Sequence, residues 1–172
     1  MTRAAAPLMS PHYRAKAVPL TGTTMGFISS SSGKACLNDW PHPLAVKDIL
    51  ELLLNLKRAV AAAGDHVILM LLIREVVPIP DAFLIKCIQG SLPAILGCCE
   101  HLVVVIEGNA LERAPLKAAF DTDRRTASKR TPPRVFDSLS TAFAFTQPLA
   151  PHDVLELQRY ALHSFPPAAE RG

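Results

Sequence analysis

Two short, uninterrupted apolar runs constrain this chain more than any other feature of its sequence. Residues 67–73 contain no polar side chain, and residues 102–106 repeat the pattern. Both runs are far too short to span a membrane. A strand with both faces buried has this appearance, because its alternating side chains all meet a core. The two runs therefore predict neighbouring central strands of a parallel sheet.

Segments with helical spacing separate these runs. In residues 44–63 apolar side chains recur every three or four positions, and Gly64 stands where a C-terminal cap belongs. Leu50, Leu52 and Leu54 widen the apolar stripe, so we expect this helix to be well covered. Its leucine-rich surface could form a homodimer face, or it could equally be core.

The rest of the chain continues the alternation of strands and helices. Asp81 can cap a second helix, in which Pro93 either introduces a kink or separates two short helices. Alternating strands and helices imply right-handed crossovers and a parallel sheet. The other predicted elements are a helix with Leu116, Ala119 and Phe120 inward, a strand at Arg134–Phe136, a short helix capped by Asp137 or Ser138, and a helix at Asp153–Ser164.

The N-terminal part predicts a hairpin. Tyr13–Leu20 alternates between apolar and charged residues, Thr21-Gly22 offers a turn, and Thr23–Ile28 could be the returning strand. Ser29–Gly33 is expected to be a polar loop.

Length and composition fit one globular domain. The chain has 172 residues, of which 49% are apolar, enough for a sizeable core. We predict disordered ends at residues 1–11 and 166–172 and a single α/β domain at 12–165. Its mostly parallel sheet has about four to five strands flanked by helices.

Charge and cysteine content exclude few classes of protein. The net charge of +3 is mild, and 6% aromatic residues are too few for an obvious base-stacking surface, so a nucleic-acid partner is a minor alternative. Residues 1–17 lack the apolar run of a signal peptide. Four irregularly placed cysteines do not suggest a disulfide framework. We expect a cytoplasmic protein with reduced thiols and no membrane association.

Three stretches together resemble the STAS domain of bacterial anti-sigma-factor antagonists and related STAS/SEC14-like proteins. They are His66–Ile73 after a helix, His101–Gly108 after a loop and helix, and Val135–Phe143, which is similar to the family's final short strand and capped helix. The resemblance implies a STAS-like fold. In the family's phosphorylation switches a serine or threonine opens the helix after the second buried strand, but Ala82 stands there. It therefore implies a protein-binding, regulatory or scaffold module rather than that switch.

No catalytic or cofactor motif can be defended from spacing. Ser32-Gly33-Lys34 is similar to a phosphate-binding loop, but six residues rather than four separate Gly26 from Gly33, and Ala35 follows the lysine. Ser31 and Lys34 have serine–lysine spacing without its companion motifs. We predict no cofactor and no catalytic residues.

Cysteine and histidine do not form a metal motif either. Cys98, Cys99 and His101 lie close together, but a structural zinc site needs a second ligand pair, and the chain offers none. We interpret the cysteines as packing residues and predict no metal site.

Polar residues gather where the two buried strands end. Ligands of open α/β sheets bind outside the carboxyl ends of the strands. Two carboxylates and an arginine there could bind a polar ligand or perform acid–base chemistry. The plainer interpretation is that Arg74 pairs with a neighbouring glutamate and Asp81 only caps a helix. The candidate ligand-binding residues are Arg74, Glu75, Asp81, Glu107 and Asn109.

A basic stretch at residues 121–134 could contact an acidic partner, although such stretches are more often solvated loops. The candidate partner-binding residues are Arg124, Arg125, Lys129 and Arg130.

Two hypotheses follow. The first is a non-enzymatic protein-interaction or regulatory module with a STAS-like fold. The second is a small-ligand-binding protein or small enzyme that uses the polar strand ends.

Overall fold

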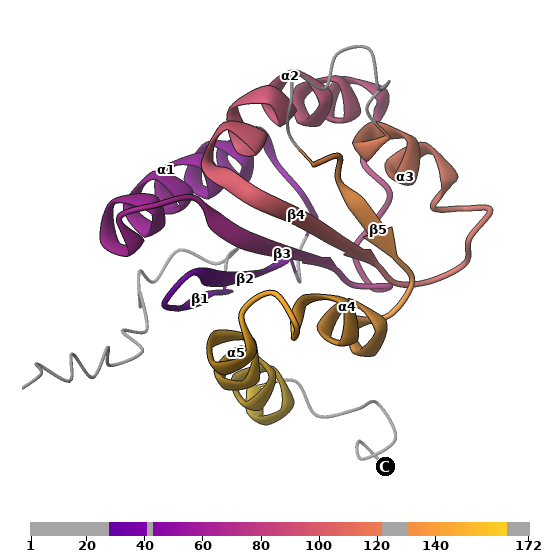
Figure 1. Ribbon diagram of the computed structural model, residues 1–172. Helices are drawn as coiled ribbons and strands as arrows, with labels where there is room; N and C mark the ends of the chain where they lie inside the picture. The colour runs from indigo at the N-terminus through magenta and orange to yellow at the C-terminus, as the bar shows by residue number, and fades with distance from the viewer. Residues whose placement is uncertain (1–27, 41–42, 122–130, 165–172) are drawn as a thin grey trace, which may run out of the picture.

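The computed structural model describes residues 28–40, 43–121 and 131–164, which form a five-stranded sheet with helices on both faces (Figure 1). The strand order is β1-β2-β3-β4-β5, with β1 antiparallel to β2 and the other pairs parallel. The predicted α/β class with a mostly parallel sheet is confirmed. The strands are β1 (Ile28–Ser32), β2 (Ala35–Trp40), β3 (Val67–Ile73), β4 (Cys99–Ile106) and β5 (Arg134–Phe136). The helices are α1 (Val46–Ala63), α2 (Ala82–Cys98), α3 (Ala114–Phe120), α4 (Leu139–Thr146) and α5 (Pro151–Ser164).

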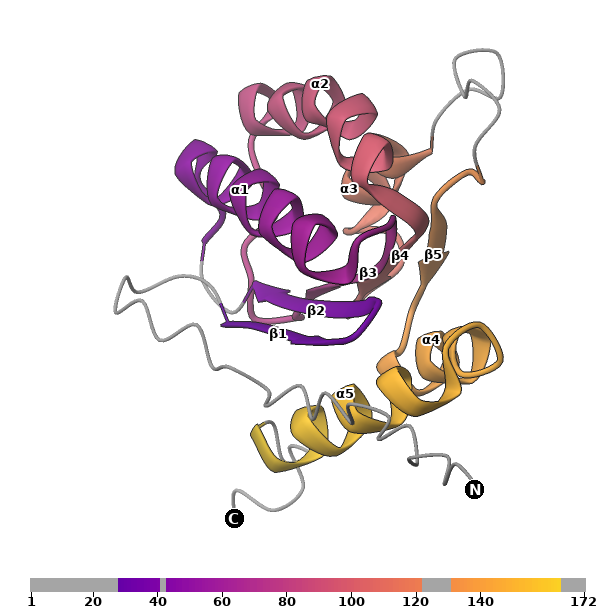
Figure 2. The same ribbon diagram turned by 60° about the vertical axis from the view of Figure 1, so that its left-hand side comes forward.

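The helices form two unequal layers. Helices α1, α2 and α3 cover one face of the sheet, and α4 and α5 cover the other (Figures 1 and 2). Each of the first three helices connects two parallel strands, and the strand order advances in one direction. Right-handed crossovers then place all three helices on the same face. The opposite face is left to the two helices that follow the last strand.

The two apolar runs are the centre of the molecule, as predicted. Every residue of β3 is buried, and β4 is buried from Leu102 to Ile106. Alternate side chains of these strands enter two separate cores. Leu69, Leu71 and Ile73 belong to the core beneath α1, α2 and α3, whereas Met70 and Leu72 belong to the core beneath α4 and α5.

Within the described residues, the first two strands, β1 and β2, form a hairpin. The expected strands at Tyr13–Leu20 and Thr23–Ile28 lie outside the described residues, apart from Ile28. The prediction of a polar loop at Ser29–Gly33 is wrong, because β1 runs to Ser32, and Ser32 pairs with Ala35 across a two-residue turn. Gly33 takes a φ of 53° there, which a glycine adopts without strain.

The helix ends agree with the sequence signals. Gly64, at a φ of 70°, ends α1, and its N–H donates to the Val60 carbonyl. Asp81 caps α2 by accepting a hydrogen bond from the Leu84 N–H at 2.8 Å. Helix α2 continues through Pro93, so the alternative of two separate helices is wrong. Of the two predicted caps for α4, Ser138 is the one that accepts the Thr141 N–H.

The prediction that α1 is well covered is wrong for one of its faces. Leu52 is fully buried, but Leu50 and Leu54 are 58% and 54% exposed, and Val46 is also exposed. These three residues are four positions apart, so they form one line along the helix, on the side opposite the core. The alternative that they belong to the core is therefore excluded, and a dimer face on α1 stays a prediction.

Candidate functional site

The edge at which β2, β3 and β4 end, here called the carboxyl edge, brings together three of the five predicted ligand-binding residues. Arg74 and Glu75 follow β3, and Glu107 follows β4. The Glu107 N–H donates to the Ile73 carbonyl at 3.0 Å, which joins the two strand ends. In β3 and β4, alternate side chains up to Leu72 and Val105 enter the core beneath α4 and α5. By the same alternation Arg74 and Glu107 continue on that face.

The partner of Arg74 is a residue that the sequence analysis missed. The Arg74 guanidinium donates to the Asp39 carboxylate, with an Nη2–Oδ2 distance of 3.1 Å. The Asp39 side chain is 1% exposed, although Asp39 lies in a strand that is otherwise largely apolar. The ion pair of Arg74 therefore joins the end of β3 to a buried carboxylate in β2, a partner that the predicted pairing with Glu75 or Glu107 did not include.

The carboxyl groups around Arg74 hold protons more tightly than usual. Burial raises the pKa of Asp39, and the hydrogen bond and positive charge of Arg74 only partly offset this effect. Burial also raises the pKa of Glu107; Arg74 lowers it, and the negative charge of Asp39 raises it further. Two carboxyl groups with raised pKa values beside one guanidinium can exchange protons or bind a polar group.

The other two predicted residues stabilise their own loops. Asp81 accepts the Leu84 N–H at the start of α2. Asn109 Oδ1 accepts the Leu111 N–H at 2.9 Å. Both side chains therefore have a local capping role, as the plainer interpretation expected for Asp81.

Arg113 joins the two loops of the carboxyl edge, and the sequence analysis missed it as well. Its buried guanidinium donates to the Val77 carbonyl at 2.7 Å and also to the carbonyls of Arg74 and Glu75. Gly108 lies against the same contacts, because a Cβ there would be 3.2 Å from Glu75 Cγ. An arginine between a glutamate and an alanine, at the start of a short helix, gives no sequence signal of such burial.

The same two loops and the first turn of α2 expose large apolar side chains. Val76, Ile79 and Phe83 follow β3, and Leu111 follows β4; we call these four residues the apolar rim. Their exposed fractions are 78%, 43%, 67% and 84%. Isolated exposed apolar residues are common, but several on one edge of a protein are typical of a binding surface. The sequence pattern predicts the charged residues of this edge but not its exposed apolar residues.

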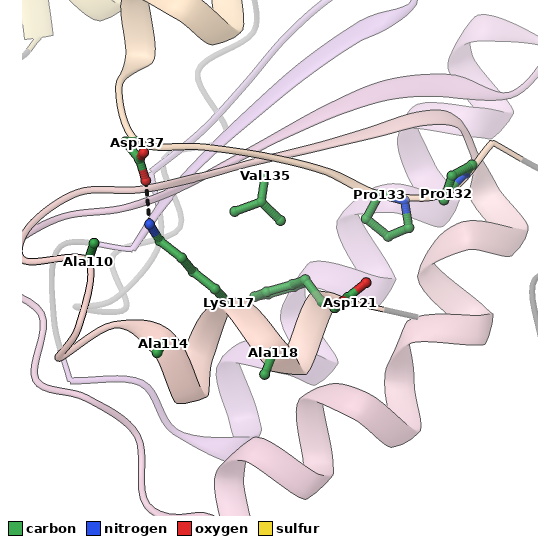
Figure 3. Close-up of a pocket in the computed structure, with 10 residues that line it drawn as sticks. Ala110, Ala114, Lys117, Ala118, Asp121, Pro132, Pro133, Val135 and Asp137 are labelled. Carbon is green, nitrogen blue, oxygen red and sulfur yellow. Dashed lines mark hydrogen bonds and ion pairs between the residues drawn. The ribbon is translucent and has the colours of Figure 1, made fainter. Parts of the chain in front are cut away.

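A groove lies between α3 and β5, with a cavity volume of about 640 Å³ (Figure 3). Lys117 reaches across it from α3 to the Asp137 carboxylate after β5. None of the predicted ligand-binding residues lines this groove. The lining residues are Ala110, Ala114, Lys117, Ala118, Phe120, Asp121, Pro132, Pro133, Val135 and Asp137.

The cysteines, the histidine and the lysine that the sequence singled out have contacts that fit a role in packing or stability. Cys98 ends α2, Cys99 is buried at the start of β4, and neither forms a disulfide. His101 packs edge-to-face on Phe145. Lys34 forms an ion pair with Asp65 at 2.9 Å. Within the described ranges, no three histidine, cysteine, aspartate or glutamate side chains are placed to hold a metal ion.

The basic residues predicted to bind a partner, Arg124, Arg125, Lys129 and Arg130, lie outside the described residues. In the part of the chain that is described, no helix has the length and apolarity needed to cross a membrane. No family model, curated protein or solved structure matches the chain.

Proposed function

We propose that this chain is a non-enzymatic, regulatory protein-interaction module with a STAS-like fold, acting in the cytoplasm. The element order supports the STAS-like part of the proposal: a hairpin, then helices alternating with parallel strands, then two helices. The observation that carries the functional part is the apolar rim, four large side chains exposed on the loops after β3 and β4 and on the first turn of α2.

The apolar rim offers burial energy to a partner, and the loops that carry it are held by hydrogen bonds. Complete burial of one such side chain contributes about 1.5–3 kcal/mol. The three hydrogen bonds of Arg113 hold the loop after β3 against the loop after β4. A surface that is already ordered loses less conformational entropy when a partner binds, so more of the burial energy appears as affinity.

The charges around the rim indicate what kind of partner fits. Glu75, Asp81 and Glu112 are exposed carboxylates on the same two loops. A partner with an apolar pocket bordered by lysine or arginine would complement them. An anionic membrane surface or a nucleic acid would be repelled. The basic residues Arg124, Arg125, Lys129 and Arg130 stay a predicted second contact, for an acidic part of a partner.

The test is affinity capture of the tagged chain from its native cells, followed by binding measurements with the recovered partner. We expect the double change Phe83→Ser and Leu111→Ser to weaken binding at least tenfold, because it removes two apolar contacts. Leu54→Ser on α1 is the matched control, since Leu54 is also an exposed leucine but lies away from the rim. Binding that is lost with Leu54→Ser and kept in the rim variant would contradict the proposal.

A second candidate function is a small-ligand site at the polar strand ends. It is favoured by the ion pair of the buried Asp39 with the part-buried Arg74, with Glu107 beside it, since such charges on an edge that commonly binds ligands are often functional. Native mass spectrometry of the purified chain tests it. A small molecule that is carried by the wild type and lost with Asp39→Asn would favour this function, and a rim variant that still carries it would separate the two candidates.

A further inference from the structure

The α3–β5 groove is a second feature that the proposed interaction module does not use. Its floor includes Val135, which packs against the same core as Phe120 of α3. The groove therefore lies on the face of the sheet that α1, α2 and α3 cover, at the edge where β5 is the last strand among the described residues. Its volume of about 640 Å³ lies within the range of small-molecule sites.

The groove exists because both of its walls carry small or rigid residues. Ala114 and Ala118 are four positions apart, so they face the groove together from α3. Pro132 and Pro133 form the opposite wall, and prolines have no backbone N–H to donate. Lys117 crosses the groove from α3 to Asp137, and the alanines and prolines beside it leave room for a compact apolar group.

The charged residues of the groove differ in whether they have an ion-pair partner. Lys117 is paired with Asp137, so these two charges neutralise each other (Figure 3). Asp121 lies four positions beyond Lys117. Its backbone N–H donates to the Ala118 carbonyl at 3.3 Å, but its exposed carboxylate makes no hydrogen bond or ion pair with the described residues. The described lining therefore has one uncompensated negative charge beside an apolar surface.

We propose that the α3–β5 groove binds a small organic cation, with a compact apolar body between the two walls and an ammonium group on Asp121. Charge complementarity favours a cation over an anion, because an anion would have to displace Asp137 from Lys117 and would also meet Asp121. The site is independent of the apolar rim, so failure of one proposal leaves the other unaffected.

The experiment titrates phenethylammonium into the full, isotope-labelled chain and follows the backbone amide signals by NMR. We expect concentration-dependent shifts at Ala114, Ala118 and Val135. 2-Phenylethanol and 3-phenylpropanoate, which present a similar ring with a neutral and an anionic group, should bind more weakly. Raising the salt concentration should reduce the difference between them, because the charge on Asp121 is exposed to solvent.

Two substitutions locate the site. Asp121→Asn should weaken phenethylammonium binding roughly threefold to fivefold, the size of one exposed charge pair. Ala118→Phe should abolish binding by filling the groove, and Ala61→Phe on the exposed side of α1 is its matched control. The proposal is overturned by preferential binding of 3-phenylpropanoate, by shifts outside the groove, or by unchanged binding in both Asp121→Asn and Ala118→Phe.

Discussion

Replacing Arg113 by alanine should destabilise the folded chain by about 2–4 kcal/mol, and the structure shows where this energy comes from. The guanidinium is buried and serves three carbonyls of the loop after β3. The Arg74 carbonyl also accepts the Val77 N–H at 3.0 Å, so it keeps a partner in the variant. The carbonyls of Val77 and Glu75 lose theirs, and each loss costs about 1–3 kcal/mol, less where water can enter.

The measurement is urea denaturation of the wild type, Arg113→Ala and Arg113→Lys. A lysine keeps the charge but lacks the planar fork that reaches several carbonyls, so we expect roughly half of the alanine effect. Because small domains have about 5–15 kcal/mol of stability, both variants should still fold. The slope of the free energy of unfolding against urea should stay constant, which shows that the same amount of surface unfolds.

Arg159→Ala is the matched control. Arg159 is an exposed arginine with one ion pair, to Glu156 at 2.8 Å, and its removal should cost at most about 0.5 kcal/mol. Equal stability of Arg113→Ala and Arg159→Ala would refute the reasoning, because it would mean that the three carbonyls do not need the guanidinium. Hydrogen exchange adds a local readout: amides of the loop after β3 should lose protection in Arg113→Ala first.

Three further predictions concern single residues. Burial raises the pKa of Asp39 above 3.8, so the folded state binds this proton more tightly than the unfolded state. The free energy of unfolding should therefore fall as the pH rises from about 4 through the folded pKa of Asp39. Urea titrations at several pH values should show that Asp39→Asn flattens this dependence. Burial raises the pKa of the Cys36 thiol to about 12. At pH 8, alkylation followed by mass spectrometry should therefore modify the half-buried Cys87 long before Cys36. Equal rates of modification would contradict this prediction. Gly33→Ala should lower the melting temperature, because a Cβ there would lie 2.4 Å from a carboxylate oxygen in α5; Gly90→Ala, with no atom within 4 Å, should keep or raise it.

The polar strand ends show how far spacing along a chain can locate a site. The sequence placed Arg74, Glu75 and Glu107 on one edge, because parallel strands that follow one another end together. It missed Asp39 as the ion-pair partner of Arg74, because Asp39 comes from a strand that was not predicted. Asn38 and Asp39 interrupt the apolar pattern of β2, and a strand that contains two buried polar residues is hard to distinguish from a loop.

The α3–β5 groove is a site that spacing along the chain could not locate. Its walls come from Ala114 and Ala118 on one side and from Pro132 and Pro133 on the other. None of these residues carries a chemical group that marks a site. Their meaning comes only from the packing of α3 beside the edge strand.

The sequence by itself determined the class of fold: two apolar runs in β3 and β4, helical spacing between them, and caps at Gly64, Asp81 and Ser138. These signals are local, because burial on both faces, helix periodicity and capping each depend on residues that are close in the chain. The tertiary structure alone decided which charged groups meet, which leucines of α1 remain exposed and where a groove opens. Those features depend on the contacts of side chains that are distant in sequence, and no spacing along the chain records them.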